Sequence, residues 1–180
     1  MSNQIYIKDN FLPKSFFHHI QTHLLSQEIE WRYSRNATYN IKGDAIGEDH
    51  YFSHTAYVQS RENNQPLVSP HYNKVQPILY FIEDKFNFEI RNLLRVNFTF
   101  ITQRRESSVT EFHIDFGVPH YVGILYLNTC NGPTLIEDKK IDFVENRMVF
   151  FDGRMKHAAV TQSDIQHRMN IVINVDGVFF

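Results

Sequence analysis

Residues 94–101 read Leu-Arg-Val-Asn-Phe-Thr-Phe-Ile, in which apolar and polar side chains alternate. Successive side chains of a β-strand leave on opposite faces, so this period of two residues predicts a strand. One face would carry Leu94, Val96, Phe98 and Phe100. The opposite face would carry Arg95, Asn97 and Thr99, which is unusually polar for a strand of this kind.

Short strand-like segments continue downstream of residue 101, separated by Asn-Gly-Pro, Asp-Gly and other polar turns. We expect strands at 111–116, 121–128, 133–136, 147–151, 157–160 and 168–175. Strands at this spacing are typical of a sandwich or a barrel. The predicted fold class is therefore α+β and mainly β.

Upstream of residue 93 the pattern is helical. Apolar residues recur at helical spacing in 14–28 and again from Val75 to Phe86, which predicts two amphipathic helices on one side of the strands. Residues 5–7 look like a short strand, and 32–72 are irregular apart from the stretch 51–58. No linker divides the chain, so we expect one domain over 1–180, with helices mainly in 14–92 and a barrel core in 93–178.

Composition excludes several classes of protein. The chain has 180 residues, of which 42% are hydrophobic, and this is ordinary for a globular domain. A net charge of −2 gives no electrostatic footprint for nucleic acid or an anionic membrane, so nucleic acid is an unlikely partner. Cys130 is the only cysteine, which excludes an intramolecular disulfide, and no leader or membrane span is apparent. We expect a cytoplasmic protein.

A His-x-Asp pair lies in the predicted strand 111–116. His113 and Asp115 are two residues apart, so both side chains would leave one face, while Phe112, Ile114 and Phe116 would leave the other. A metal bound there needs a third ligand, and His157 on a later strand is the natural candidate. Two histidines and one carboxylate form a facial triad, which holds Fe(II) and leaves positions for other ligands.

Arg168 lies eleven residues after His157 on the predicted strand 168–175. Arg168, Asn170 and Val172 would share one face, and the intervening apolar residues would pack on the other. An inward-pointing arginine requires an anion, and its planar fork suits the far carboxylate of a 2-oxo acid that chelates the iron. Tyr126 is either a second donor to that carboxylate or a tyrosine of the core.

These residues resemble the Fe(II)/2-oxoglutarate-dependent dioxygenases, and among them the prolyl-hydroxylase-like branch. The resemblance rests on His113-Ile-Asp115, His157 and Arg168. Four flanking stretches support it: Ile5 to Pro13, Leu125-Tyr-Leu-Asn128, Asn131-Gly-Pro-Thr134 and Asn146-Arg147 to Phe151-Asp152. It implies a double-stranded β-helix, the jelly-roll or cupin-like barrel. It also implies that His113, Asp115 and His157 bind the iron, with Arg168 and Tyr126 binding 2-oxoglutarate.

The chain departs from the branch at two positions. Collagen-type prolyl hydroxylases have lysine where this chain has Arg168, and many relatives have tyrosine where it has Asn97. Asn97 is therefore either a cofactor-binding amide or a plain polar residue of the barrel interior.

The resemblance further implies hydroxylation with Fe(II), 2-oxoglutarate and O2, release of succinate and CO2, and ascorbate as a candidate reductant. A prolyl residue in a peptide or protein is the first candidate substrate, with small molecules also open. Three alternatives remain: a non-catalytic cupin-like metal-binding module, a nucleic-acid demethylase and a zinc hydrolase with a His/Asp/His site. Substrate specificity is expected in residues 32–72 and 103–110, and the oligomeric state is open.

Overall fold

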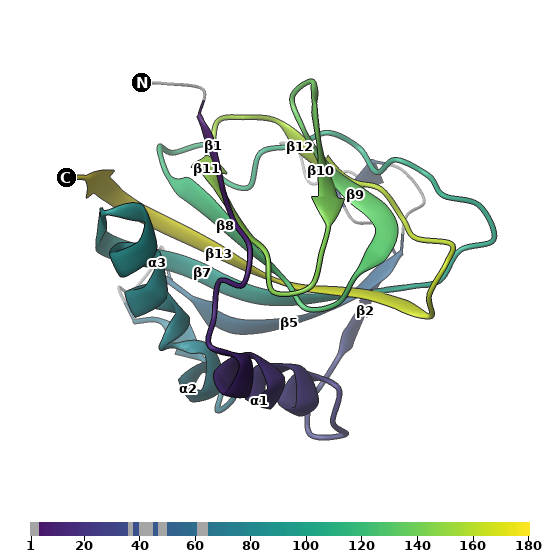
Figure 1. Cartoon of the computed structure of the whole chain (residues 1–180), viewed down its shortest axis with the longest axis horizontal. Coiled ribbons are helices and arrows are strands. Elements are labelled where there is room, and N and C mark those ends of the chain that lie inside the picture. Colours follow the sequence, from purple (N-terminus) through teal and green to yellow (C-terminus); the bar gives the residue numbers. More distant parts are fainter. Residues whose placement is uncertain (1–3, 36–37, 40–44, 47–49, 61–64) are drawn as a thin grey trace.

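The largest part of the fold is an eight-stranded antiparallel sheet, in a computed structural model that describes residues 4–35, 38–39, 45–46, 50–60 and 65–180 (Figure 1). The strand order is β1-β11-β8-β13-β7-β5-β2, with β6 paired to β5. The strands are β1 (Ile5–Lys8), β2 (Arg32–Ser34), β5 (Tyr51–Val58), β6 (Leu67–Val68), β7 (Phe88–Thr102), β8 (Tyr121–Tyr126), β11 (Met148–Asp152) and β13 (His167–Phe179).

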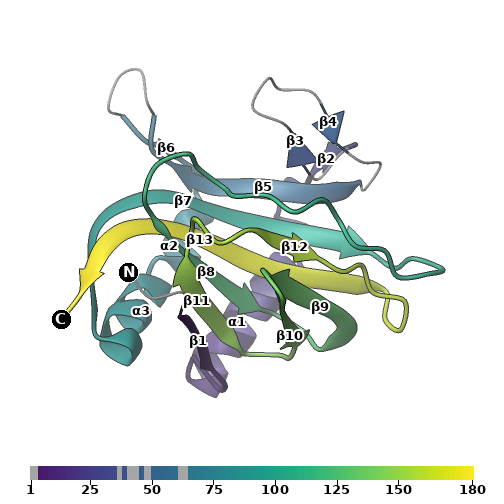
Figure 2. The same cartoon turned by 90° about the horizontal axis from the view of Figure 1, so that it is seen from above.

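A second sheet faces the first one. It has the order β10-β9-β12, formed by β9 (Cys130–Ile136), β10 (Lys139–Phe143) and β12 (His157–Ala159), and it lies above the main sheet in Figure 1. Apolar side chains from both sheets form one buried cluster that includes Ile124, Phe143 and Phe151. A separate two-stranded ribbon, β3 (Thr38–Tyr39) and β4 (Ala45–Ile46), lies beyond β5 (Figure 2). The two facing sheets confirm the predicted barrel.

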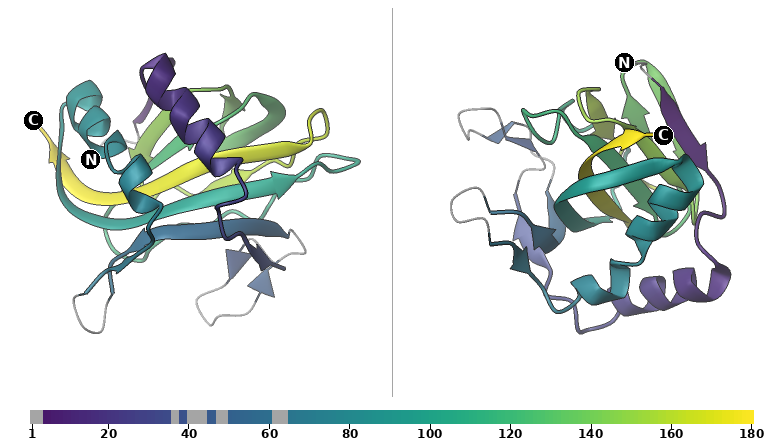
Figure 3. Two further views of the ribbon diagram at one scale, coloured as in Figure 1. Left: turned by 90° about the horizontal axis from the view of Figure 1, so that it is seen from below. Right: turned by 90° about the vertical axis from the view of Figure 1, so that its left-hand side faces the viewer.

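The helices cover the outer face of the main sheet (Figure 3). They are α1 (Lys14–Leu24), α2 (Tyr72–Val75) and α3 (Ile78–Phe86). Buried residues of α1 and α3 pack with Val96 and Phe98 of β7 and with Ile171 of β13 in the main core. Apolar burial of this kind contributes roughly 1.5–3 kcal/mol for each large side chain. The alternation read from residues 94–101 is therefore confirmed, with the polar face turned into the barrel.

Several predicted boundaries were wrong. The helix expected from Val75 to Phe86 is split into α2 and α3 at Pro77, whose ring does not fit inside a helix. Asn87 then adopts a left-handed conformation with φ 51°, and β7 begins at Phe88 instead of residue 93. Strands β2 and β6 lie in 32–72, which was expected to be irregular apart from the stretch 51–58 that forms β5, and β10 was not predicted at all.

The strand expected at 111–116 is absent. Within 111–116 the main chain makes one isolated bridge, from His113 to His157 at the start of the three-residue strand β12, and a second bridge joins Val109 to Val160 just before the segment. Phe112 and Ile114, which were expected on the face opposite to His113 and Asp115, are each 42% exposed. The segment therefore runs along the rim of the barrel.

Within these described ranges, no helix has both the length and the apolar character needed to cross a membrane.

Candidate active site

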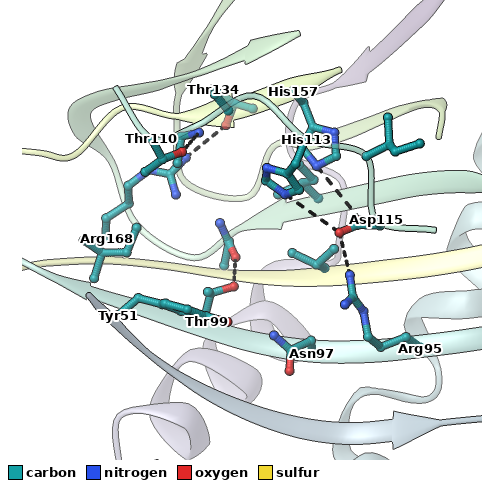
Figure 4. Close-up of a pocket in the computed structure, with 17 residues that line it drawn as sticks. Tyr51, Arg95, Asn97, Thr99, Thr110, His113, Asp115, Thr134, His157 and Arg168 are labelled. Atoms are coloured by element: carbon teal, nitrogen blue, oxygen red, sulfur yellow. Dashed lines mark hydrogen bonds and ion pairs between the residues drawn. The ribbon is translucent and has the colours of Figure 1, made fainter. Parts of the chain in front are cut away.

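His113, Asp115 and His157 meet at the mouth of the barrel (Figure 4). The candidate ligand atoms of the three residues all lie within 4.8 Å of one another. His113 Nε2 is 4.0 Å from Asp115 Oδ1, and His157 Nε2 is 4.0 Å from Asp115 Oδ2. Two imidazoles and one carboxylate at this spacing can hold a divalent transition metal.

Backbone contacts set the orientation of both imidazoles. His113 and His157 exchange reciprocal main-chain hydrogen bonds of 3.0 Å, which bring their side chains together although 44 residues separate them. His113 Nδ1 lies 3.1 Å from the carbonyl oxygen of Glu111, and His157 Nδ1 lies 3.3 Å from that of Met155. A carbonyl only accepts, so each Nδ1 carries the proton and each Nε2 keeps a free lone pair for a metal.

Asp115 is held by two donors that the sequence reasoning did not assign to it. Arg95 Nη2 lies 2.7 Å from Oδ1, and Asn174 Nδ2 donates to Oδ2 at 2.8 Å. Burial alone would raise the pKa of Asp115, but the positive charge of Arg95, the two histidines and the Asn174 hydrogen bond lower it well below its usual value. The carboxylate is therefore ionised and ready to bind a cation.

Burial lowers the pKa of His157 to about 4, against an ordinary value of 6.5. The folded protein thus binds this proton less readily than the unfolded chain, and the metal-free protein should lose stability as pH falls from 6.5 to about 4. Once His157 is fully protonated, the loss in the free energy of unfolding amounts to about 3 kcal/mol. We expect metal-free wild type to become less stable relative to His157→Gln between pH 7 and pH 4.5, measured by urea unfolding. Parallel pH profiles of the two proteins would contradict this assignment.

One pocket of about 340 Å³ extends from the triad to Arg168. Its wall includes Arg168, Asn170 and Val172 of β13, as the alternation predicted, while the intervening apolar residues of β13 pack toward the helices. Thr99 donates a hydrogen bond to Asn170 inside this pocket. The triad and Arg168 therefore share a single cavity of a size suited to small molecules.

Arg168 is only 2% exposed and is held by polar groups of β9. Its Nε donates to the carbonyl of Gly132 at 3.1 Å, its Nη2 donates to Thr134 Oγ1 at 3.0 Å, and its guanidinium lies 4.1 Å from the ring centroid of Phe143. Among the described residues, no carboxylate forms an ion pair with it. Burial lowers its pKa, which reflects the cost of a charge without a counter-ion.

Tyr126 is fully buried next to these groups, and its hydroxyl has no hydrogen-bond partner in the described part of the chain. Burial raises its pKa to about 12, while the nearby Thr134 side chain and the charge of Arg168 oppose the rise. The ring stacks on Phe143 with centroids 4.0 Å apart. An unpaired donor beside a buried cation is suited to an anion, but Tyr126 is not among the residues that line the pocket.

Asn97 lines the pocket from β7, and its Oδ1 accepts a hydrogen bond from Thr55 at 3.2 Å. Arg95 and Thr99 line the pocket from the same strand, as their shared parity in residues 94–101 implies. Because Arg95 shares this inward face with Asn97 and Thr99, the sequence pattern could have indicated that Arg95 contacts a site residue such as Asp115.

Other candidates lie outside this pocket. His23, His54 and His71 meet where α1, β5 and α2 converge, with His23 Nε2 3.1 Å from His71 Nδ1. Asp152, which precedes His157 by five residues, pairs with Arg154, and the carboxylate that joins the two histidines is that of Asp115. Lys139 and Lys140 were expected in a turn, but they begin β10.

The constraint at Gly153 is space and not a left-handed backbone conformation. A Cβ at this position would lie 2.2 Å from Nε2 of buried His120. We expect Gly153→Ala to lower the free energy of unfolding by about 1–3 kcal/mol through overpacking, measured by urea denaturation. Gly117→Ala is the matched control, because nothing lies within 4 Å of its added Cβ. Equal stability of the two variants would contradict the expectation.

No family model and no curated protein matches the sequence, but many solved structures match the fold. A prolyl hydroxylase from Trichoplax adhaerens, in complex with a hypoxia inducible factor peptide fragment, is 15% identical with a TM-score of 0.64, over 97% of this chain and 84% of that one. An oxidoreductase of the 2OG-Fe(II) oxygenase family from Burkholderia pseudomallei is 10% identical with a TM-score of 0.68, over 96% and 85%.

The chain has the 2OG-Fe(II) oxygenase fold. A prolyl-4-hydroxylase from Pseudomonas putida is also similar, with 12% identity and a TM-score of 0.57 over 97% of this chain and 92% of that one. These likenesses confirm the fold that the sequence motifs predicted. Similarity at such low sequence identity shows the fold only, so the roles of individual residues must be argued from the geometry of this chain.

Proposed function

We propose that this protein is an Fe(II)- and 2-oxoglutarate-dependent dioxygenase. The observation that carries the proposal is one pocket with a His-Asp-His triad along one part of its wall and a buried arginine without a counter-ion along another. A metal-binding module would need the triad alone. A zinc hydrolase would likewise have no use for Arg168.

The donor set suits the groups that this reaction needs. His113, Asp115 and His157 would hold Fe(II), since two neutral imidazoles and one carboxylate match its ligand preferences. Arg168 and Thr134, which line the pocket, would bind the far carboxylate of 2-oxoglutarate, and Tyr126, which does not line the pocket, would support them from the adjoining core. When bound with O2, the iron supplies oxidation of a substrate C–H bond, with release of succinate and CO2.

The chain's own residues contribute orientation and a defined protonation state. The main-chain bridge between His113 and His157 aligns both ring nitrogens, and the carbonyls of Glu111 and Met155 hold the Nδ1 protons away from the metal side. Ile124 and Val172 line the pocket with apolar surface that limits water near the reacting groups. Ascorbate would serve as the reductant that keeps the iron in the Fe(II) state.

A prolyl residue in a peptide or protein is our first candidate substrate. The structural neighbour from Trichoplax adhaerens binds a peptide fragment, which supports a peptide on this fold. Nucleic-acid demethylation is the second candidate from the same fold, and the net charge of −2 disfavours it. Asn97 faces the same pocket and would bind either the cosubstrate or the substrate.

The deciding experiment measures succinate after addition of 2-oxoglutarate, Fe(II), O2 and ascorbate. We expect succinate to form in proportion to O2 consumed, and to increase with a substrate peptide whose mass rises by one oxygen atom. No succinate from protein that binds Fe(II) would favour the metal-binding module. Formaldehyde released from methylated DNA would instead favour the demethylase.

A further inference from the structure

Asp115 lies on a segment without a strand ladder. The bridge between His113 and His157 ends before Asp115, and no main-chain pairing reaches this residue. Phe112 and Ile114, its apolar neighbours in sequence, are exposed and do not anchor the segment. The side chain is nevertheless 92% buried, with an exposed fraction of 8%. Something other than local secondary structure must therefore fix its carboxylate.

Two side chains from the adjoining strands of the main sheet supply that restraint. Arg95 of β7 and Asn174 of β13 are paired across the sheet, and Arg95 Nε donates to Asn174 Oδ1 at 3.0 Å. Arg95 then contacts one carboxylate oxygen of Asp115, and Asn174 contacts the other. The three side chains close a ring, which we call the Asp115 clamp.

Arg95 and the two imidazoles approach Asp115 from different sides (Figure 4). Arg95 reaches the carboxylate from the floor of the sheet, while His113 and His157 lie across it, each with Nε2 4.0 Å from a different oxygen. An ionised carboxylate has about four lone-pair positions, and the clamp occupies two of them. The remaining lone pairs of the carboxylate can be directed toward the space between the imidazoles.

We propose that Arg95 and Asn174 are positioning residues that orient Asp115 for metal binding. The inference rests on the proposed function, because it needs the triad to be a metal site. Partners of metal-binding side chains fix ligand orientation, and their loss typically lowers metal affinity by about 10- to 100-fold. The clamp takes the place of the missing strand ladder at this ligand.

Charge balance is the competing explanation, since Arg95 also offsets the charge of Asp115. Two substitutions that leave net charge unchanged separate these effects. Asn174→Leu keeps a branched side chain but removes one hydrogen bond to the carboxylate. Arg95→Lys keeps the positive charge but loses the fork that contacts Asn174 and Asp115 together. If only charge mattered, both variants would bind metal as wild type does.

The test titrates Co(II) into the metal-free full-length protein and follows visible absorption, which reports affinity and ligand geometry. We expect both variants to bind Co(II) about 10- to 100-fold more weakly, with a changed absorption band. Asn92→Leu is the matched control, because Asn92 donates to Asp176 across the same two strands at an exposed site. Arg91→Lys controls for arginine replacement on β7, and both controls should match wild type.

The outcomes distinguish the clamp from the site itself. Wild-type affinity and spectrum in either folded clamp variant would overturn the proposal and leave the metal site intact. Wild-type protein that binds no Co(II) would overturn the proposed function together with the clamp. Asn174 is fully buried, so thermal unfolding is recorded for every variant. If Asn174→Leu does not fold, the part-exposed Arg95→Lys decides the result.

Discussion

Asp115→Ala is expected to reduce Fe(II) affinity by more than the roughly 10- to 100-fold that loss of an outer partner costs. It removes the only charged ligand of the triad. The substitution also leaves the guanidinium of Arg95 facing the metal position without its carboxylate, so a cation there would meet uncompensated repulsion. Anaerobic equilibrium dialysis against Fe(II) measures the effect directly.

Asp176→Ala is the matched control for that experiment. Asp176 also accepts a hydrogen bond from an asparagine on the main sheet, but its pair is exposed and does not line the pocket. This variant should bind one Fe(II) as wild type does. An unchanged iron content in Asp115→Ala would refute the ligand set.

Arg168→Met is expected to weaken 2-oxoglutarate binding by about 30-fold to several thousand-fold, while Fe(II) binding persists. The reason is that truncating one partner of a buried charged pair costs about 2–5 kcal/mol. Arg168 is only 2% exposed, so water would do little to solvate the 2-oxoglutarate carboxylate that had lost its partner. Calorimetric titration of the anaerobic iron-loaded protein with 2-oxoglutarate measures the loss.

Arg168→Lys should fall between wild type and Arg168→Met. A lysine retains the charge, but one ammonium cannot contact Gly132, Thr134 and a carboxylate with the geometry of the guanidinium. Arg91→Met, on the exposed part of β7, is the control and should leave 2-oxoglutarate affinity unchanged. Equal affinity in wild type and Arg168→Met would remove the cosubstrate assignment and leave a metal-binding barrel.

Much of the site was predictable because the face of a strand on which a side chain lies follows from its position in the local sequence. The alternation in 94–101 placed Asn97 on a polar face, and the alternation after residue 167 placed Arg168 on the same face as Asn170. Both faces line the pocket, since β7 and β13 pair without a register shift from Thr102 and His167 to Arg95 and Asn174, which preserves the period of two residues there.

The remainder depended on tertiary contacts that no local pattern contains. His113 and Asp115 come together although their segment is not a strand, so the predicted proximity was correct and the predicted reason was wrong. The contact between Arg95 and Asn174 joins residues 79 positions apart, and the sequence around either residue does not predict it. Likewise, β10 was not predicted because its exposed lysines are typical of a turn, and only the pairing with β9 makes this segment a strand.

The pairing of β7 with β13 also bears on how the protein folds. Its registered partners lie from 65 residues apart, at Thr102 and His167, to 91 residues apart, at Phe88 and Phe179. Contacts this distant in sequence raise the contact order, and chains dominated by them fold slowly because a long loop closes before the contacts form. Arg95, Arg168 and Asn174 all lie on these two strands, so cosubstrate pocket and metal clamp should form in the same late step. Pulsed hydrogen exchange during refolding should show their amides gaining protection together, after those of α3.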